Sequence, residues 1–223
     1  MRKPLQAIIF DLDGVITDTA AFHFLAWKAL ASKLNIHLTK EFNEKLKGIS
    51  RMESLELILA YGRSRHDFSD EEKLALAEEK NDHYLMLIKT ITPNDILPGI
   101  KQLILECKKL NIKLGLASAS KNAGLVMKRL ALINDFDCIV DAKLITNGKP
   151  NPEIFLTAAS LLQVEPEVCI GIEDAVAGIE AIKAAGMFAV AVGRQEMFGK
   201  ADFVVESTNK LDFEEIIKQY YMN

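Results

Sequence analysis

The sequence predicts an α/β protein with a doubly wound parallel sheet and a helical cap domain inserted after the first strand. Beyond Pro98-Gly99, short apolar runs typical of strands alternate with segments of helical periodicity. Strands that alternate with helices in this way are typical of a parallel sheet covered by helices. From Thr19 to about Thr92 the pattern is helical throughout. This helical block therefore interrupts the α/β pattern after its first strand.

The elements follow in order along the chain. Residues 7–10 are short, apolar and β-branched, as expected of a buried parallel strand. Within the helical block, Ser69 with Glu72 forms a plausible capping box. After it the sequence predicts helices at 100–110, 123–132, 152–162 and 177–186, and strands at 112–117, 138–142, 168–172, 188–192 and 202–205. These elements divide the chain into a core domain, residues 1–15 and 93–223, and a cap domain, residues 16–92.

Composition excludes several classes of protein. The chain has 223 residues, 49% of them hydrophobic and 26% charged, which fits neither a disordered chain, nor collagen, nor a coiled coil. The net charge of -4 gives no overall attraction to nucleic acid or to an anionic membrane, so any phosphate must be bound locally. The first apolar run is too short for a signal peptide or a membrane span. We expect a cytoplasmic monomer with neither nucleic acid nor membrane as a partner.

The three cysteines are expected to be reduced core residues. Cys107, Cys138 and Cys169 are widely spaced, without a CxxC motif, and Cys169 lies in an apolar run. Isolated cysteines of this kind are typical of cytosolic proteins.

Polar residues follow the predicted strands at four places. In an open parallel sheet, ligands bind outside the carboxyl ends of the strands. The residues at those ends are Asp11 and Asp13, Ser118 to Asn122, Lys149, and Glu173 with Asp174. Four carboxylates brought together cannot all stay ionised unless a cation compensates them. Carboxylate oxygens suit Mg²⁺, and the sequence has no cluster of His and Cys residues for zinc.

Asp11 and Asp13 have the spacing of a nucleophile and its acid/base partner. Side chains alternate along an extended chain, so both carboxylates point to the same side. One can attack phosphorus and form an aspartyl phosphate while the other transfers the proton. Ser118 and Lys149 would hold the oxygens of the transferring phosphoryl group.

Simpler interpretations of these residues remain open at this point. An isolated DxD pair is often a helix cap, and Ser118 and Ser120 could cap the helix that begins near Asn122. An isolated lysine is usually on the surface. For Lys149, however, Gly148 and Pro150 favour a fixed loop.

Four segments resemble, in order and spacing, the signature motifs of the haloacid dehalogenase superfamily. They are FDLDGVITDT (10–19), SASKN (118–122), GKPNP (148–152) and GIEDAVAGIEAIKAAGM (171–187). The resemblance implies a Rossmann-like core, Asp11 as nucleophile and Asp13 as general acid/base. It also implies that Mg²⁺ is bound by Asp11, the Asp13 carbonyl, Glu173 and Asp174. The Lys149-Pro150 peptide bond is expected to be cis.

The cap sequence resembles the β-phosphoglucomutase family. The resemblance lies in TDTAAFHFLAWKAL (17–30), LKGISRMESL (46–55), EEKNDHY (78–84) and ASASKN (117–122). It implies that Arg51 binds the phosphate remote from the reacting one. The other residues implied in substrate binding are Thr19, His23, Trp27, Lys47, Gly48, Ser54, Lys80, Ala119, Ser120 and Asn122. Without the resemblance, Trp27 would be assigned to core packing and Arg51 and Lys47 to a solvated helix end.

The activity implied is the interconversion of β-D-glucose 1-phosphate and glucose 6-phosphate. The phosphorylated enzyme would pass through β-glucose 1,6-bisphosphate, which makes the enzyme a magnesium-dependent isomerase. One alternative is a sugar-phosphate phosphatase that uses the same nucleophile with water as the acceptor. A more remote alternative is a sugar-phosphate sensor without catalysis.

Overall fold

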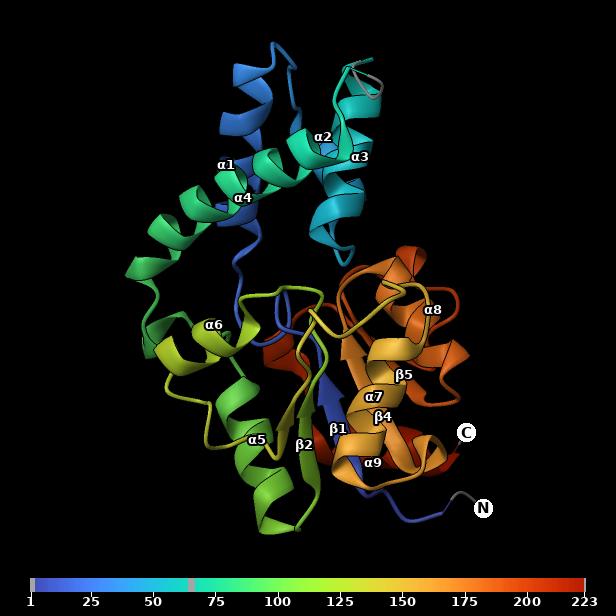
Figure 1. The fold of residues 1–223 in the computed structure, drawn as a ribbon. Helices are drawn as coiled ribbons and strands as arrows, with labels where there is room; N and C mark the ends of the chain where they lie inside the picture. The colour runs from blue at the N-terminus through green and yellow to red at the C-terminus, as the bar shows by residue number, and fades with distance from the viewer. Residues whose placement is uncertain (1–2, 64–66, 223) are drawn as a thin grey trace.

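A six-stranded parallel sheet forms the centre of the structure, a computed structural model that describes residues 3–63 and 67–222. The strand order is β3-β2-β1-β4-β5-β6, and every paired neighbour is parallel. The strands are β1 (Ala7–Phe10), β2 (Lys113–Leu116), β3 (Cys138–Ile139), β4 (Cys169–Glu173), β5 (Phe188–Val192) and β6 (Phe203–Val205). The prediction of a doubly wound parallel sheet is confirmed (Figure 1).

Helices cover both faces of this sheet. They are α5 (Ile100–Lys109), α6 (Ala123–Arg129), α7 (Glu153–Leu162), α8 (Val176–Ala184) and α9 (Phe213–Met222). On β1, Ile8 and Phe10 belong to a core cluster with residues of α5, α6 and α9. Ala7 and Ile9 point to the other face, where α7 and α8 pack. Because both faces are buried, the strands are apolar throughout rather than alternating.

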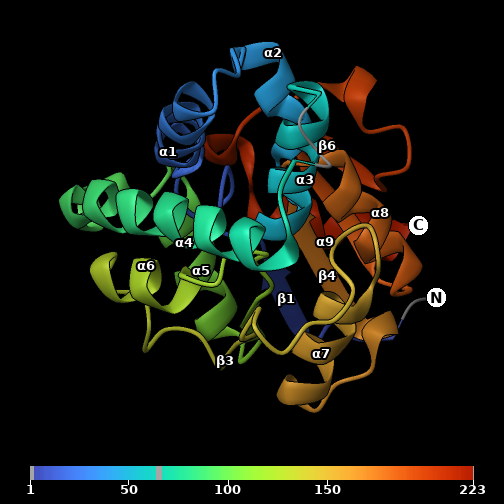
Figure 2. The same cartoon turned by 45° about the horizontal axis from the view of Figure 1, so that its top comes forward.

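The inserted helices lie beyond the carboxyl edge of the sheet (Figures 1 and 2). They are α1 (Ala20–Lys33), α2 (Lys40–Asn43), α3 (Arg51–Tyr61) and α4 (Asp70–Leu87). Their apolar side chains form a separate cluster that includes Trp27, Leu55 and Ile58. The predicted capping box of Ser69 and Glu72 is present, and Ser50 with Glu53 forms another at the start of α3. The domain boundaries at 15/16 and 92/93 stay a prediction, and residues 1–2, 64–66 and 223 within those ranges lie outside the described residues.

The strand predicted at 138–142 is shorter in the structure. Only Cys138 and Ile139 are in strand conformation. The chain then turns, because the carboxylate of Asp141 accepts a hydrogen bond from the Lys143 N–H and its carbonyl accepts one from the Leu144 N–H. Side chains of this type favour turns over strands. The polar loop that carries Lys149 therefore begins earlier than predicted.

Three smaller predictions concern single features. The Lys149-Pro150 bond is cis, as expected. The three cysteines are free thiols; Cys107 and Cys169 are buried and Cys138 is partly exposed. Among the described residues, no helix combines the length and apolar character needed to cross a membrane.

Candidate active site

The ends of the two central strands bring the acidic residues together. Phe10 of β1 is in register with Ile172 of β4, and the N–H of Asp11 donates to the Ile172 carbonyl at 2.9 Å. Asp11 therefore lies directly beside the end of β4. Carboxylate oxygens of Asp11, Glu173 and Asp174 come within 4.8 Å of one another.

Lys149 lies beneath this acidic group. Its side chain is fully buried, and its Nζ donates to Asp11 Oδ1 at 2.6 Å and to Glu173 Oε2 at 2.7 Å. Burial disfavours the ammonium, but the two carboxylates outweigh it and raise the pKa of Lys149. The surface-lysine interpretation is therefore wrong for Lys149, which links two carboxylates as a cation.

The acidic group is suited to a divalent cation. Burial, followed by the charge of Asp11, raises the pKa of Glu173 well above its usual range and that of Asp174 to about 7. Crowded carboxylates of this kind are compensated only partly by one lysine. The donors are all oxygen, as Mg²⁺ requires. The Asp13 carboxylate is outside this group of three.

Two glycines allow the close approach on which the site depends. Gly14 has φ +78°, and a Cβ at this position would lie 2.1 Å from the Asp174 carboxylate. A Cβ on Gly178 would lie 2.1 Å from the Glu173 side chain. Any larger residue at either position would push a carboxylate away, so these glycines belong to the construction of the acidic group.

Asp13 has the surroundings of a general acid. Its Oδ1 accepts hydrogen bonds from the N–H of Thr19 at 3.1 Å and from the Thr19 hydroxyl. The Thr19 hydroxyl thus acts as a donor, so the buried Tyr84 phenol, 3.1 Å away, donates to it. Burial and the neighbouring charge of Asp11 raise the pKa of Asp13 to about 7. A carboxyl group that titrates near neutrality can both give and take a proton.

His23 and Lys80 form a second pair beside Asp13. Lys80 Nζ lies 2.7 Å from His23 Nδ1 and over the rings of Trp27 and Tyr84, at 4.6 and 5.0 Å from their centroids. When Lys80 carries its proton it can only donate, so Nδ1 then accepts and the proton of the neutral imidazole lies on Nε2. That nitrogen is 3.9 Å from Asp13 Oδ2. Burial, then the charge of Lys80, holds the pKa of His23 well below its usual value.

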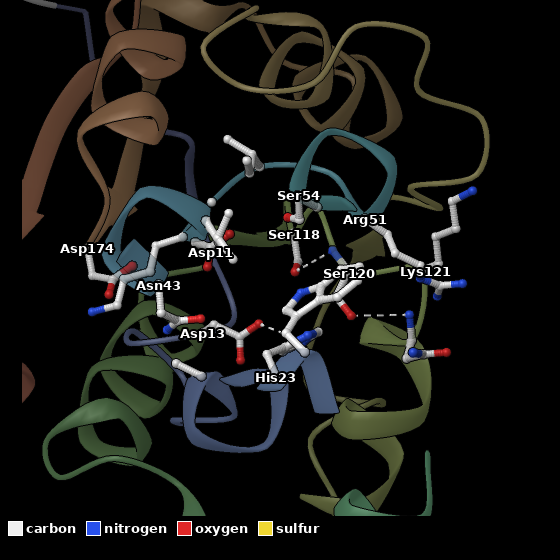
Figure 3. A pocket seen from close by; sticks show the side chains of 18 of the residues that line it. Asp11, Asp13, His23, Asn43, Arg51, Ser54, Ser118, Ser120, Lys121 and Asp174 are labelled. Carbon is white, nitrogen blue, oxygen red and sulfur yellow. Dashed lines mark hydrogen bonds and ion pairs between the residues drawn. The ribbon is translucent and has the colours of Figure 1, made fainter. Parts of the chain in front are cut away.

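These groups share one pocket, of about 810 Å³ including its open mouth. In Figure 3 the carboxylates of Asp11, Asp13 and Asp174 lie at one end and the cationic side chains of Arg51 and Lys121 at the other. Most of the predicted residues line this pocket: Asp11, Asp13, His23, Trp27, Lys47, Gly48, Arg51, Ser54, Lys80, Ser118, Ala119, Ser120, Asn122 and Asp174. The predicted residues Thr19, Lys149 and Glu173 are buried behind the lining. Thr19 contacts Asp13, and Lys149 contacts both Asp11 and Glu173.

Some lining residues escaped the sequence analysis. They are Ala20, Asn43, Leu46, Ile49 and Lys121. Lys121 stands between two predicted residues in ASASKN, so its position in the motif could have identified it. Asn43 is a single polar residue at the end of a short helix, which no pattern distinguishes from a surface residue.

The hydroxyls of Ser118 and Ser120 also have local roles. Ser118 Oγ accepts from the N–H of Ser120 at 3.2 Å, and Ser120 Oγ accepts from the N–H of Asn122 at 3.3 Å. Residue Asn122 is the N-cap of α6, without a capping bond from its own side chain. The serines therefore shape the loop before α6, and both still line the pocket.

Comparison with known proteins identifies the class. A model of the haloacid dehalogenase-like hydrolase family matches residues 5–186. With the sheet and the acidic group described above, this match shows that the chain belongs to that family. Within it, the chain is a homologue of phosphomutases. It is 53% identical over 210 residues to β-phosphoglucomutase of Bacillus subtilis, covering 94% of this chain and 93% of that protein.

Solved structures and more distant relatives agree with this placement. The crystal structure of β-phosphoglucomutase from Clostridium difficile superposes with a TM-score of 0.96 at 56% identity, covering 98% of each chain. A phosphorylated carbohydrates phosphatase of Thermotoga maritima is 31% identical over 82% of each chain. The chain is thus much more similar to these two mutases than to this phosphatase.

Proposed function

We propose that the protein interconverts β-D-glucose 1-phosphate and glucose 6-phosphate by phosphoryl transfer through Asp11. One observation carries this proposal: the pocket has the Asp11 carboxylate at its acidic end and the cationic side chains of Arg51 and Lys121 at its other end (Figure 3). A sugar with phosphates at two positions fits such a pocket in either orientation, with one phosphate at Asp11 and the other at Arg51. The similarity to the mutase of Bacillus subtilis supports the choice of sugar.

In the first half-reaction, β-glucose 1-phosphate binds to enzyme already phosphorylated on Asp11. Asp13 removes the proton of the sugar 6-hydroxyl, whose oxygen attacks phosphorus. The bond between phosphorus and the Asp11 carboxylate breaks, and β-glucose 1,6-bisphosphate forms. Asp13, whose pKa is near neutrality, is suited to this step.

In the second half-reaction, the bisphosphate lies in the opposite orientation. The Asp11 carboxylate attacks the 1-phosphate, and Asp13 returns its proton to the sugar oxygen as the bond to phosphorus breaks. Glucose 6-phosphate leaves, and the aspartyl phosphate is restored. The same two side chains serve both halves, so the reaction needs no further acid or base.

Surrounding residues position these groups. Lys149 holds Asp11 in place through its 2.6 Å hydrogen bond, and Thr19 holds the carboxylate of Asp13. We assign Asp11, Glu173, Asp174 and the Asp13 carbonyl to a bound Mg²⁺, which would neutralise charge on the transferring phosphoryl group. Arg51 would bind the non-reacting phosphate bidentately. Ser118 would contact the phosphoryl oxygens, and the other predicted pocket residues would contact the sugar or that remote phosphate.

The test follows both possible products. The purified protein is incubated with Mg²⁺, β-glucose 1-phosphate and a trace of β-glucose 1,6-bisphosphate, and glucose 6-phosphate and inorganic phosphate are measured together. We expect glucose 6-phosphate with little phosphate release. Release of phosphate with free glucose would instead support the phosphatase alternative. Absence of any turnover would support the alternative of a sugar-phosphate sensor without catalysis. Cytoplasmic location and the monomeric state stay predictions, testable by fractionation and sedimentation.

A further inference from the structure

Asn81 lies outside the lining of the pocket, yet contacts two residues that form it. Its Oδ1 accepts a hydrogen bond from Arg51 Nη2 and another from Asn122 Nδ2, each at 2.8 Å. These donors come from the first residue of α3 and from the N-cap of α6, while Asn81 itself belongs to α4. One oxygen therefore joins the cap helices to the loop that follows β2.

The chemistry of the donors fixes the orientation of both amides. An arginine guanidinium has only donors, so the Asn81 atom that faces Arg51 must be its oxygen. Because Asn122 reaches that same oxygen, its NH₂ group points toward Asn81. Arg51 and Asn122 both line the pocket, and each has further N–H groups that are not used by Asn81.

An amide suits this position better than a carboxylate. A carboxylate would also accept both hydrogen bonds, but it would neutralise the charge of Arg51. The amide orients the guanidinium and leaves its full charge available to an anion. Arg51 is partly buried, which lowers its pKa. A negative charge added beside it would therefore pair with the guanidinium and weaken its attraction for a phosphate.

We propose that Asn81 is a positioning residue that holds Arg51 and Asn122 together as one binding site for the substrate phosphate remote from Asp11. This inference rests on the proposed function for the identity of the sugar. Of the mechanism, the inference requires only that a second phosphate of the substrate binds at this end of the pocket.

The experiment compares two phosphoryl donors for Asp11. β-Glucose 1,6-bisphosphate would place a phosphate at each end of the pocket, whereas acetyl phosphate has only the reacting one. Phosphorylation of Asp11 is measured for the wild type, Asn81→Leu, Asn81→Asp and the control Asp82→Asn. Asp82 is the exposed neighbour on α4 whose charge acts on Arg51.

We expect both Asn81 variants to lower kcat/KM for the bisphosphate by about tenfold or more, mainly through KM. With acetyl phosphate the loss should be under about threefold, and Asp82→Asn should stay within about twofold for both donors. Asn81→Asp should retain both hydrogen bonds, so its loss with the bisphosphate would come from the charge that it places beside Arg51. If Asn81 only stabilised the structure, Asn81→Leu would lower phosphorylation equally with both donors, and the proposal would be overturned.

A second measurement tests whether Asn81 acts through Arg51 and Asn122. In the background Arg51→Ala with Asn122→Ala, the change Asn81→Leu should add less than about twofold, because its two partners are gone. The proposal would be contradicted if Asn81→Leu lowered kcat/KM in this background as much as it does in the wild type. Equal losses of kcat/KM with both phosphoryl donors would also contradict it. A wild type that is phosphorylated by the bisphosphate but forms no glucose 6-phosphate would refute the proposed function alone, because the donor comparison needs only the phosphorylation of Asp11.

Discussion

The two ends of the pocket are built in different ways. At the acidic end, Lys149 and Glu173 are fully buried and paired at 2.7 Å, between the ends of parallel strands. At the cationic end, Arg51 is half-buried and Lys121 is exposed. These side chains start from helix ends and a loop, and Arg51 is held through the amide of Asn81.

This difference suggests that the residues proposed for phosphoryl transfer and those proposed for binding the remote phosphate can be altered separately. Asp11 and Asp13 follow directly after β1, and the backbone of Asp11 is hydrogen-bonded to β4, so their geometry is set by the core. The groups that we propose bind the remote phosphate come from helix ends and a loop, so changes there should alter affinity for a substrate while leaving the nucleophile intact. The predictions below test this separation.

The largest effect is expected from Asp11→Asn. The variant should lose mutase turnover by more than about a thousandfold, because an amide cannot form the aspartyl phosphate. Its fold should survive, since Lys149 keeps Glu173 as a partner. Turnover is measured beside thermal unfolding and mass spectrometry of the phosphorylated chain. Substantial remaining activity would show that another residue is the nucleophile.

Lys149→Met should damage both activity and stability. It removes the cation that compensates Asp11 and Glu173, which stay buried. Loss of one partner from a buried ionic group typically costs about 3–5 kcal/mol of unfolding free energy. Added Mg²⁺ should restore part of that stability, because we assign the same carboxylates as its ligands. Denaturant unfolding with and without Mg²⁺ measures this, and a variant as stable as the wild type without metal would contradict the assignment.

The acidic end could be predicted from the sequence because of its position in the chain. Asp11 directly follows an apolar strand, and Glu173 ends another, so the topology alone brings them to one edge. What the sequence could not provide was the path of the loop from Asp141 to Gly148. The full burial of Lys149 depends on that path, because it brings the side chain between two strands.

The cationic end was harder to predict from the residues themselves. Helical periodicity assigned Trp27 to core packing, and its ring does pack in the cap cluster while also lining the pocket. Periodicity gives the apolar faces of a helix but not the neighbour that each face meets. Periodicity gave no signal for Asn81, a single asparagine on a polar helix, although it lies in the EEKNDHY segment that carries the resemblance. Its role depends on contacts made after the helices have packed.

Arg51→Ala tests the separation of the two ends directly. Mutase kcat/KM should fall by roughly ten- to a hundredfold, since a charge-assisted contact to phosphate is lost. Hydrolysis of a small ester such as p-nitrophenyl phosphate should change far less, because it places no second phosphate at Arg51. Steady-state kinetics on both substrates measure the ratio. Equal losses on both would show that Arg51 supports the fold rather than the remote phosphate.

The smallest effect concerns Lys80, a residue that is only 3% exposed. Burial, then the charge of Arg51, lowers its pKa to about 7, against 10.5 for an ordinary lysine. Between about pH 7 and 10.5 the unfolded chain therefore binds more protons at this position, and stability rises with pH. Lys80→Met should remove this dependence. At pH 7 the variant should be more stable by roughly 1–3 kcal/mol, with the difference vanishing near pH 10.5. Urea unfolding across this range measures it. A variant less stable at pH 7 would show that Lys80 is stabilised as a cation by its aromatic neighbours.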